Sequence, residues 1–200
     1  MKKEPTQGRA RATVEAVVTA AAQLLAERGY ASLTTNHIAE RAGVSIGSIY
    51  QYFPGKEAII ARLFEQTVDE ILGEFAQGLL ALPPHEGKAR HAYAAGVLYD
   101  TIDRRAALVR AMQYEVPFLR DLPIIGEMRQ RLLALATQIY AANISPRAFA
   151  RPDVAAFLLT AMLQAAILES ILMPVPGIGR TEVVETLAEI IGRILGPLAG

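Results

Sequence analysis

The sequence contains no cysteine and no tryptophan, and only 6% of its residues are aromatic. Without cysteine, the chain has no disulfide bond and no thiol nucleophile. Absence of cysteine also fits a protein of a reducing compartment. We therefore predict a cytoplasmic protein.

Long apolar stretches are also missing. The longest runs from Val154 to Leu168 and is interrupted by Thr160 and Gln164, which is short of the roughly 18 residues that a membrane span needs. The N-terminus is basic and then rich in alanine and valine, as in a signal peptide. Polar side chains interrupt that segment, however, and a helical periodicity explains it better. We expect no membrane partner.

The chain has no net charge, because 20 Lys and Arg residues balance 20 Asp and Glu residues. This balance hides a difference between the two ends. Residues 1–62 carry eight Lys or Arg against five Glu, whereas the remainder carries twelve against fifteen acidic residues. A basic end on an acidic body is typical of a nucleic-acid-binding module attached to a body that does not bind nucleic acid.

Motifs for catalysis are absent from the sequence. The three histidines, His37, His85 and His91, have no metal-ligand spacing, and the segment Gly177 to Gly179 lacks the third glycine and the preceding strand of a nucleotide-binding loop. No nucleophile motif occurs. We therefore predict a protein that is not an enzyme, with no catalytic residue, no metal and no cofactor.

Apolar residues recur at the spacing of helix faces, and no segment alternates as a strand would. Val14, Val17, Val18, Ala21, Leu24 and Leu25 lie on one such face, and Gly29 follows as a stop signal. The sequence predicts an all-α fold with about nine helices. We expect them at about 13–28, 35–42, 45–53, from 56 to before Pro83, 87–103, 105–115, 123–142, 152–173 and 181–197.

The second and third of these helices are joined by a tight turn at Gly43 and form a helix-turn-helix. Such a pair places its second helix in the major groove of DNA, where base edges are legible. The outer face of that helix has almost no charge but many short hydrogen-bonding groups. Its residues are Ser45, Ile46, Gly47, Ser48, Tyr50, Gln51 and Tyr52.

Each of these residue types suits contact with DNA. Gly47 costs helix stability, about 1 kcal/mol relative to alanine, but it lets the helix backbone approach DNA closely. Ser48 and Gln51 can hydrogen-bond bases, and glutamine pairs well with adenine. Tyr50 and Tyr52 suit phosphate contact or packing against a thymine methyl group.

Phosphate contacts are expected at the edges of the motif. Thr34, Thr35 and the free amides at the start of their helix can bind one phosphate, and Lys56 at the start of the fourth helix can reach another. Simpler explanations stay open at this stage. Gly47 could be a tolerated glycine, and Tyr50 and Tyr52 could be half-buried core residues.

The motif resembles the DNA-binding domain of the TetR family of transcriptional regulators. The resemblance covers about residues 13–63, including the pattern from Ala21 to Tyr30. The matching residues are Thr35-Asn36-His37-Ile38-Ala39-Glu40-Arg41-Ala42-Gly43-Val44-Ser45, Gly47-Ser48-Ile49-Tyr50, Tyr52-Phe53 and Lys56-Glu57. One departure is Gln51, where aromatic or basic residues are common in the family, and this departure bears on the operator sequence.

The resemblance implies a homodimer that binds a palindromic operator, usually as a repressor, and that has a divergent C-terminal domain which binds a small molecule. It assigns recognition contacts to Ile46, Gly47, Ser48, Tyr50 and Tyr52, and phosphate contacts to Thr34 or Thr35 and Lys56. We accordingly divide the chain into a flexible basic tail (1–12), a helix-turn-helix domain (13–57) and a ligand-binding and dimerisation domain (58–200).

Dimerisation is expected through the helices at about 152–173 and 181–197. The first is apolar around most of its circumference, so it must be buried on more than one side. Packing both helices against their copies gives a four-helix interface. The alternative is that they form the ordinary core of a monomer.

An effector pocket is expected among the middle helices, where aromatic, methionine and a few polar side chains gather. The candidates are Phe75, Tyr93, Tyr99, Met112, Gln113, Tyr114, Glu115 and Phe118. Core packing explains most of them equally well. Glu115 would meet a cationic or hydroxyl-bearing ligand if it faced a pocket.

Together these features predict a regulator, most often a repressor, that a small hydrophobic or amphipathic effector releases from DNA. Binding of the effector would shift the population toward a state in which the two DNA-binding heads are too widely separated. The alternative function is a DNA-binding regulator controlled by a protein partner.

Overall fold

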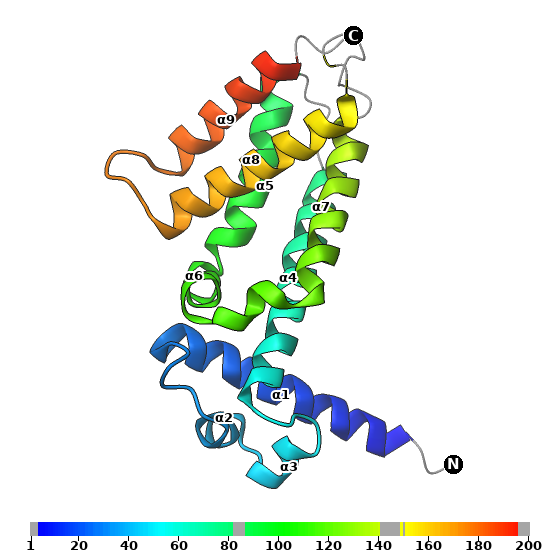
Figure 1. The fold of residues 1–200 in the computed structure, drawn as a ribbon, viewed down its shortest axis with the longest axis vertical. Helices are drawn as coiled ribbons and strands as arrows, with labels where there is room; N and C mark the ends of the chain where they lie inside the picture. The colour runs from blue at the N-terminus through cyan, green and yellow to red at the C-terminus, as the bar shows by residue number, and fades with distance from the viewer. Residues whose placement is uncertain (1–3, 82–86, 141–148, 150, 196–200) are drawn as a thin grey trace. The chain divides into compact units, whose positions relative to one another are not determined.

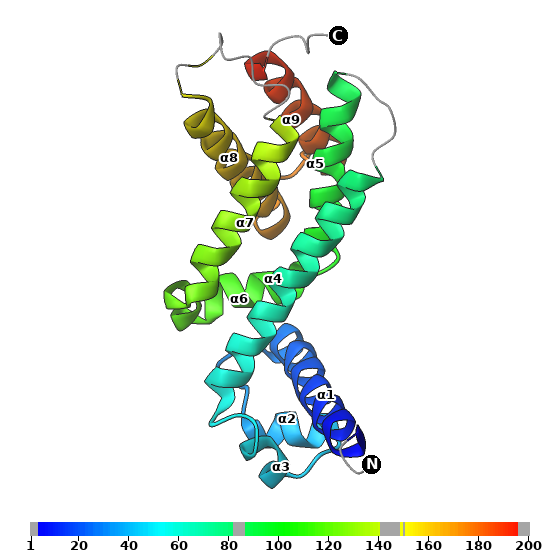
Figure 2. The same cartoon turned by 90° about the vertical axis from the view of Figure 1, so that its right-hand side faces the viewer.

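The computed structural model describes residues 4–81, 87–140, 149 and 151–195, and Figures 1 and 2 show their fold from two sides. In these residues the chain forms nine α-helices and one 3-10 helix, and no strand. The elements are α1 (Glu4–Arg28), α2 (Thr35–Ala42), α3 (Ile46–Tyr50), α4 (Lys56–Leu80), α5 (Lys88–Asp103), α6 (Ala106–Glu115), η1 (Pro117–Asp121), α7 (Pro123–Tyr140), α8 (Pro152–Leu172) and α9 (Arg180–Leu195). The predicted all-α fold is confirmed.

Most predicted helices match the observed ones closely, but the predicted start of the first helix is wrong. It was expected at Thr13, whereas α1 begins at Glu4. Proline is tolerated in the first turn of a helix, which admits Pro5, and the arginines and alanines that follow are good helix formers. The predicted ends at residues 142 and 197 lie outside the described residues. The 3-10 helix η1 was not predicted.

The described chain divides into two compact units. The head unit comprises the chain up to Asp69 together with Ala107–Leu122, and the body unit comprises Glu70–Ala106 and the chain from Pro123 onward. Helix α4 therefore belongs to both units. The functional boundary near residue 57 stays a prediction, because these units are defined by contacts alone.

The head unit has a single apolar core. It joins α1, α2, α3 and the first half of α4 to the end of α6 and to η1. Val17, Leu25, Ile38, Ile49 and Ile59 are completely buried in it. Burying a side chain of this size contributes about 1.5–3 kcal/mol. The segment Ala107–Leu122 takes part through Met112, Val116 and Leu119, which are all buried.

In the body unit, α5 packs against α9 and α8, and α8 also packs against α7. Ion pairs near both ends of α5 join it to α9. The Arg180 guanidinium donates two hydrogen bonds to the Asp100 carboxylate, at 2.5 and 2.7 Å, and Lys88 Nζ lies 2.6 Å from Glu189 Oε1. The Arg180 contact lowers the pKa of Asp100.

Helix α8 is apolar but only partly covered. By length and composition alone it could cross a membrane, although this is weak evidence for a span, and 22% of its most apolar window is buried. Its buried side, with Ala156, Leu159 and Ile167, faces the body unit's own core. Four large apolar side chains on other sides of the helix remain exposed. These are Val154, Phe157, Leu158 and Met162.

Candidate nucleic-acid interface

The α2–α3 pair is held in a helix-turn-helix by hydrogen-bonded caps at both ends of α2. The Thr34 hydroxyl accepts a hydrogen bond from the His37 N–H at 3.2 Å and so caps the start of the helix. Gly43 ends α2 with φ of 68°, a left-handed conformation that favours glycine. Its N–H and that of Val44 bond to the carbonyls of Glu40 and Ala39.

Helix α3 is short and is anchored from one side. The Ser45 hydroxyl accepts a hydrogen bond from the Ser48 N–H at 3.1 Å and caps the start of the helix. Ile49 is completely buried and Phe53 is 7% exposed. These two side chains fix the helix to the head core and leave its opposite face to solvent.

The solvent face of α3 carries the residues that were predicted to contact DNA. Tyr50 is 56% exposed, Tyr52 41% and Ile46 37%, so these side chains lie at the surface and not in the core. Ser45, Gly47 and Gln51 are exposed as well, and Ser48 is half-buried.

Glycine at position 47 leaves open space at the surface. A Cβ added there would lie 3.8 Å from the Ser45 hydroxyl oxygen, which is ordinary van der Waals contact. The fold therefore tolerates a side chain at this position. No packing constraint of the head accounts for Gly47, which is consistent with a close approach to a partner.

The structure brings two predicted contact residues of different helices together. Thr35 Oγ1 lies 3.4 Å from the Tyr50 hydroxyl oxygen, within hydrogen-bonding distance. The hydroxyl groups at the start of α2 and on α3 therefore face a common surface. Their contacts with DNA stay predictions.

Lys56 has partners within the head that the sequence did not reveal. Its ammonium group donates to the carbonyls of Leu33 at 3.1 Å and Tyr30 at 3.4 Å. It also lies 4.2 Å from the centroid of the Tyr30 ring, in a cation–π contact. Lys56 thus closes the loop between α1 and α2, and a phosphate contact would have to share its protons with these carbonyls.

Replacing Lys56 with methionine is expected to lower the free energy of unfolding by about 1–3 kcal/mol, since two carbonyls lose a charged donor. Urea denaturation followed by circular dichroism measures this change. The matched control is Arg62→Met, because Arg62 is an exposed cation of the same helix whose pair with Glu65, three residues away, is solvent-exposed. If Lys56→Met and Arg62→Met both left the unfolding midpoint unchanged, this would contradict the structural role of Lys56.

Tyr30 joins several elements of the head, a role that its place in the pattern from Ala21 to Tyr30 did not predict. Its hydroxyl donates to the Glu57 carboxylate at 3.2 Å, and its ring packs edge-on against Phe118 with centroids 6.1 Å apart. Burial, and next the charge of Glu57, raise the pKa of Tyr30. Tyr30 therefore joins the end of α1 to the start of α4 and to η1.

Glu115 is bound to the head and not isolated in a pocket. Its carboxylate accepts a hydrogen bond from the Tyr30 N–H at 2.8 Å. Gly29 ends α1 with φ of 73°, which disfavours any other residue, and a Cβ there would have to displace this carboxylate. A glycine–tyrosine pair after a helix is the signal that could have pointed to this contact, but its distant partner could not be read from the sequence.

The eight candidate effector residues fall into both compact units. Phe75, Tyr93 and Tyr99 belong to the body unit, where Phe75 and Tyr99 are buried and Tyr93 is half-buried. The other five belong to the head unit: Met112 is buried in its core, Phe118 is half-buried, and Gln113, Tyr114 and Glu115 are exposed. Effector contacts of all eight stay predictions.

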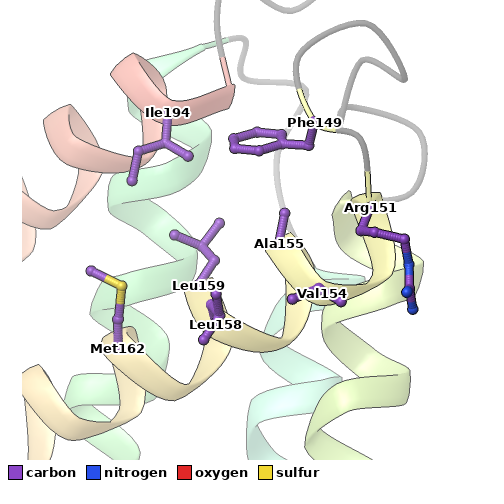
Figure 3. Close-up of a pocket in the computed structure, with 8 residues that line it drawn as sticks. All are labelled: Phe149, Arg151, Val154, Ala155, Leu158, Leu159, Met162 and Ile194. Carbon is purple, nitrogen blue, oxygen red and sulfur yellow. The ribbon is translucent and has the colours of Figure 1, made fainter.

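The body unit contains a cavity of about 300 Å³ between α8 and α9 (Figure 3). Its lining is Phe149, Arg151, Val154, Ala155, Leu158, Leu159, Met162 and Ile194, none of which was a predicted effector residue. In Figure 3 the Arg151 side chain points away from the apolar group, and it binds the Asp153 carboxylate at 2.6 and 2.9 Å. This ion pair lowers the pKa of Asp153 to about 2. The cavity itself is therefore apolar.

Residues 17–63 match the family model described as bacterial regulatory proteins, tetR family. The chain is 34% identical over 104 residues to the HTH-type transcriptional repressor KstR2 of Mycolicibacterium smegmatis, which covers 52% of this chain and 49% of that protein. It is 30% identical over 100 residues to the HTH-type transcriptional regulator EthR of Mycobacterium tuberculosis, with 49% and 45% covered. The chain thus spans about half the length of these curated relatives.

Solved structures extend the likeness in fold over nearly the whole chain. A TetR-family transcriptional regulator from Mesorhizobium loti superposes with a TM-score of 0.71 at 18% identity, covering 94% of this chain and 96% of that one. The fatty acid degradation regulator FadR from Bacillus halodurans superposes with a TM-score of 0.67 at 19% identity, covering 98% and 97%. At these identities the likeness concerns the fold alone.

Proposed function

Because the chain belongs to the TetR family of bacterial regulatory proteins, we propose that it is a cytoplasmic repressor that binds a palindromic operator as a homodimer. A small hydrophobic or amphipathic effector releases it from DNA. That the chain is a DNA-binding transcriptional regulator and not an enzyme follows from the family. The homodimer, the operator contacts and the effector are our proposal.

The observation that carries the proposal is the solvent face of α3. A recognition helix enters the major groove with a face that its own domain leaves exposed. Helix α3 has such a face, because Ile49 and Phe53 anchor its opposite face in the core. Tyr50, Tyr52 and Ile46 are exposed although they are large and apolar in part. An exposed aromatic group rimmed by hydroxyls is explained by a partner that covers it.

The homodimer is supported by the uncovered side of α8. Val154, Phe157, Leu158 and Met162 recur at helical spacing and are between 39% and 58% exposed. A second copy of α8 and α9 packed on this side would bury them in a four-helix interface. Three cavity-lining residues, Val154, Leu158 and Met162, belong to the same side. In the proposed dimer this cavity therefore lies against the second subunit.

The dimer sets the geometry of DNA binding. Two recognition helices that occupy adjacent major grooves on one side of the duplex must lie about 34–36 Å apart. A ligand that prefers any other separation lowers DNA affinity, and by reciprocity DNA lowers the affinity for that ligand.

Coupling between effector and DNA is supported by the path of the chain. It passes between the units three times, at residues 69–70, 106–107 and 122–123. The middle segment, Ala107–Leu122, is fastened to the head through Glu115 at the Tyr30 N–H and through Phe118 at the Tyr30 ring. A change in the body unit that displaces α6 would therefore act on the end of α1 and the start of α4.

The test is binding of the purified protein to the intergenic DNA beside its own gene, with thermal unfolding measured against a panel of hydrophobic and amphipathic ligands. We expect nanomolar operator binding by a dimer, and a raised Tm with ligands that also release DNA. A strict monomer that binds DNA with full affinity would contradict the dimer. Operator binding with no Tm shift across a broad panel would favour control by a protein partner.

A further inference from the structure

The recognition surface of the head lacks positive charge. No Lys or Arg occurs between Ala42 and Gly55, so α3 and both its flanking turns bring no cation to DNA. Neutralising phosphates supplies nearly all of the non-specific affinity of DNA-binding proteins and a large share of their specific affinity. Other parts of the head must therefore supply the cations.

Two cations near the helix-turn-helix already have partners inside the head. The Lys56 ammonium group binds the carbonyls of Tyr30 and Leu33. Arg41 forms a two-pronged contact with the Glu27 carboxylate at 2.9 and 3.0 Å and a further bond to Gln23 at 3.3 Å. Turning either side chain toward a phosphate would break these contacts.

Arg9 and Arg11 differ from those two cations in their surroundings. Both are exposed, and Arg9 makes no ion pair with the side chains that the structure describes. Arg11 pairs with Glu15 at 3.0 Å, but the two side chains are 84% and 62% exposed and lie one helical turn apart. Such a pair contributes little in water, so Arg11 is readily available to a phosphate.

Helix α1 carries these two arginines beyond the head core. Among the α1 side chains from Gly8 onward, which the structure describes, Val14 is the first apolar one packed against that core, and Val17 is the first that is completely buried. At 1.5 Å per residue, Arg9 lies about 8 Å farther along the axis than Val14. Figures 1 and 2 both show this end of α1 at the same end of the head as α3. In the described residues this part of the chain is helical from Glu4 onward.

We propose that the extension of α1, through Arg9 and Arg11, is a second DNA-binding site that contacts backbone phosphates beside the groove entered by α3. The partner is the sugar–phosphate backbone, so the contact is independent of base sequence. This inference rests on the proposed function. It assigns electrostatic affinity to α1 and base recognition to the neutral face of α3.

The test compares the salt dependence of DNA binding for the full chain and for the double variant Arg9→Gln/Arg11→Gln. The probe is a fluorescent 30-base-pair duplex of arbitrary sequence, and the intergenic duplex is measured in parallel. The slope of log K against log salt is negative, and each lost phosphate contact reduces its magnitude by about 0.9. We expect a reduction of about 1.8 per bound protomer on both duplexes, with an unchanged preference for the intergenic sequence.

The matched control is Arg28→Gln/Arg62→Gln, which removes the same charge from two exposed arginines of the head elsewhere on α1 and α4. It should keep a slope close to that of the unmodified chain. Equal slopes for the double variant and the unmodified chain would overturn the inference, as would an equal loss in the control. Failure of the unmodified chain to bind either duplex would instead overturn the proposed function.

Discussion

Replacing Gly47 with glutamate is expected to lower operator affinity about 100-fold or more while the head stays folded and the protein dimeric. The added carboxylate would lie on the solvent face of α3, where it meets phosphates and base edges. Like charges brought together in an interface cost several kcal/mol. Because a Cβ at position 47 meets nothing closer than the Ser45 hydroxyl oxygen at 3.8 Å, the loss would come from DNA binding and not from unfolding.

Fluorescence anisotropy with the intergenic duplex measures the affinity of this variant, and circular dichroism and gel filtration monitor its fold and assembly. The matched control is Gly47→Ala, which adds bulk without charge. Alanine should stabilise α3 by up to about 1 kcal/mol and weaken operator binding less than glutamate does. If Gly47→Glu binds the operator normally, α3 is not the recognition helix.

Local patterns were enough to predict most helices. Helices α5 to α9 each begin within one residue of the predicted position, because apolar periodicity, prolines and glycines are local signals. The same signals misplaced the start of α1, since its first residues are polar all round and lack a periodic pattern. A helix of good formers continues without an apolar face until a breaker stops it.

The roles of Lys56 and Glu115 could not be predicted, because their partners are distant in sequence. Lys56 bonds to the carbonyl of Leu33, 23 residues away, and Glu115 to the N–H of Tyr30, 85 residues away. Backbone groups carry no residue-specific signal, so no pattern marks them as partners. Both residues contact the loop after α1, which connects α1 to the helix-turn-helix.

The exposure of α8 also needed the structure. A helix that is apolar on most sides is expected to be buried on most sides, and the sequence cannot distinguish a monomer core from a subunit interface. The structure separates the two cases by residue: Ala156, Leu159 and Ile167 are buried by their own chain, whereas Leu158 and Met162 are more than half exposed. The second group is the one that a partner subunit would have to cover.

Replacing Leu158 with aspartate is accordingly expected to convert the proposed dimer into a folded monomer. Leu158 is 52% exposed, so a charge there is tolerated by the isolated chain, whereas in the proposed interface it would be buried without a partner. Two linked half-site contacts exceed one by about 10²–10⁴ in affinity. Operator affinity should therefore fall by about this factor, although the recognition surface is unchanged.

Analytical ultracentrifugation measures the assembly of the variant, and anisotropy measures its binding to the full operator and to a single half-site. The matched control is Leu80→Asp, the same substitution at a leucine that is 89% exposed on α4; it should remain dimeric with full affinity. Half-site binding shows whether the loss of operator affinity comes from lost dimerisation or from a damaged recognition surface. A monomer with an intact α3 should bind a half-site as tightly as the unmodified chain does. A dimeric Leu158→Asp variant would place the interface elsewhere, and a monomeric one with full operator affinity would show that the head binds DNA without pairing.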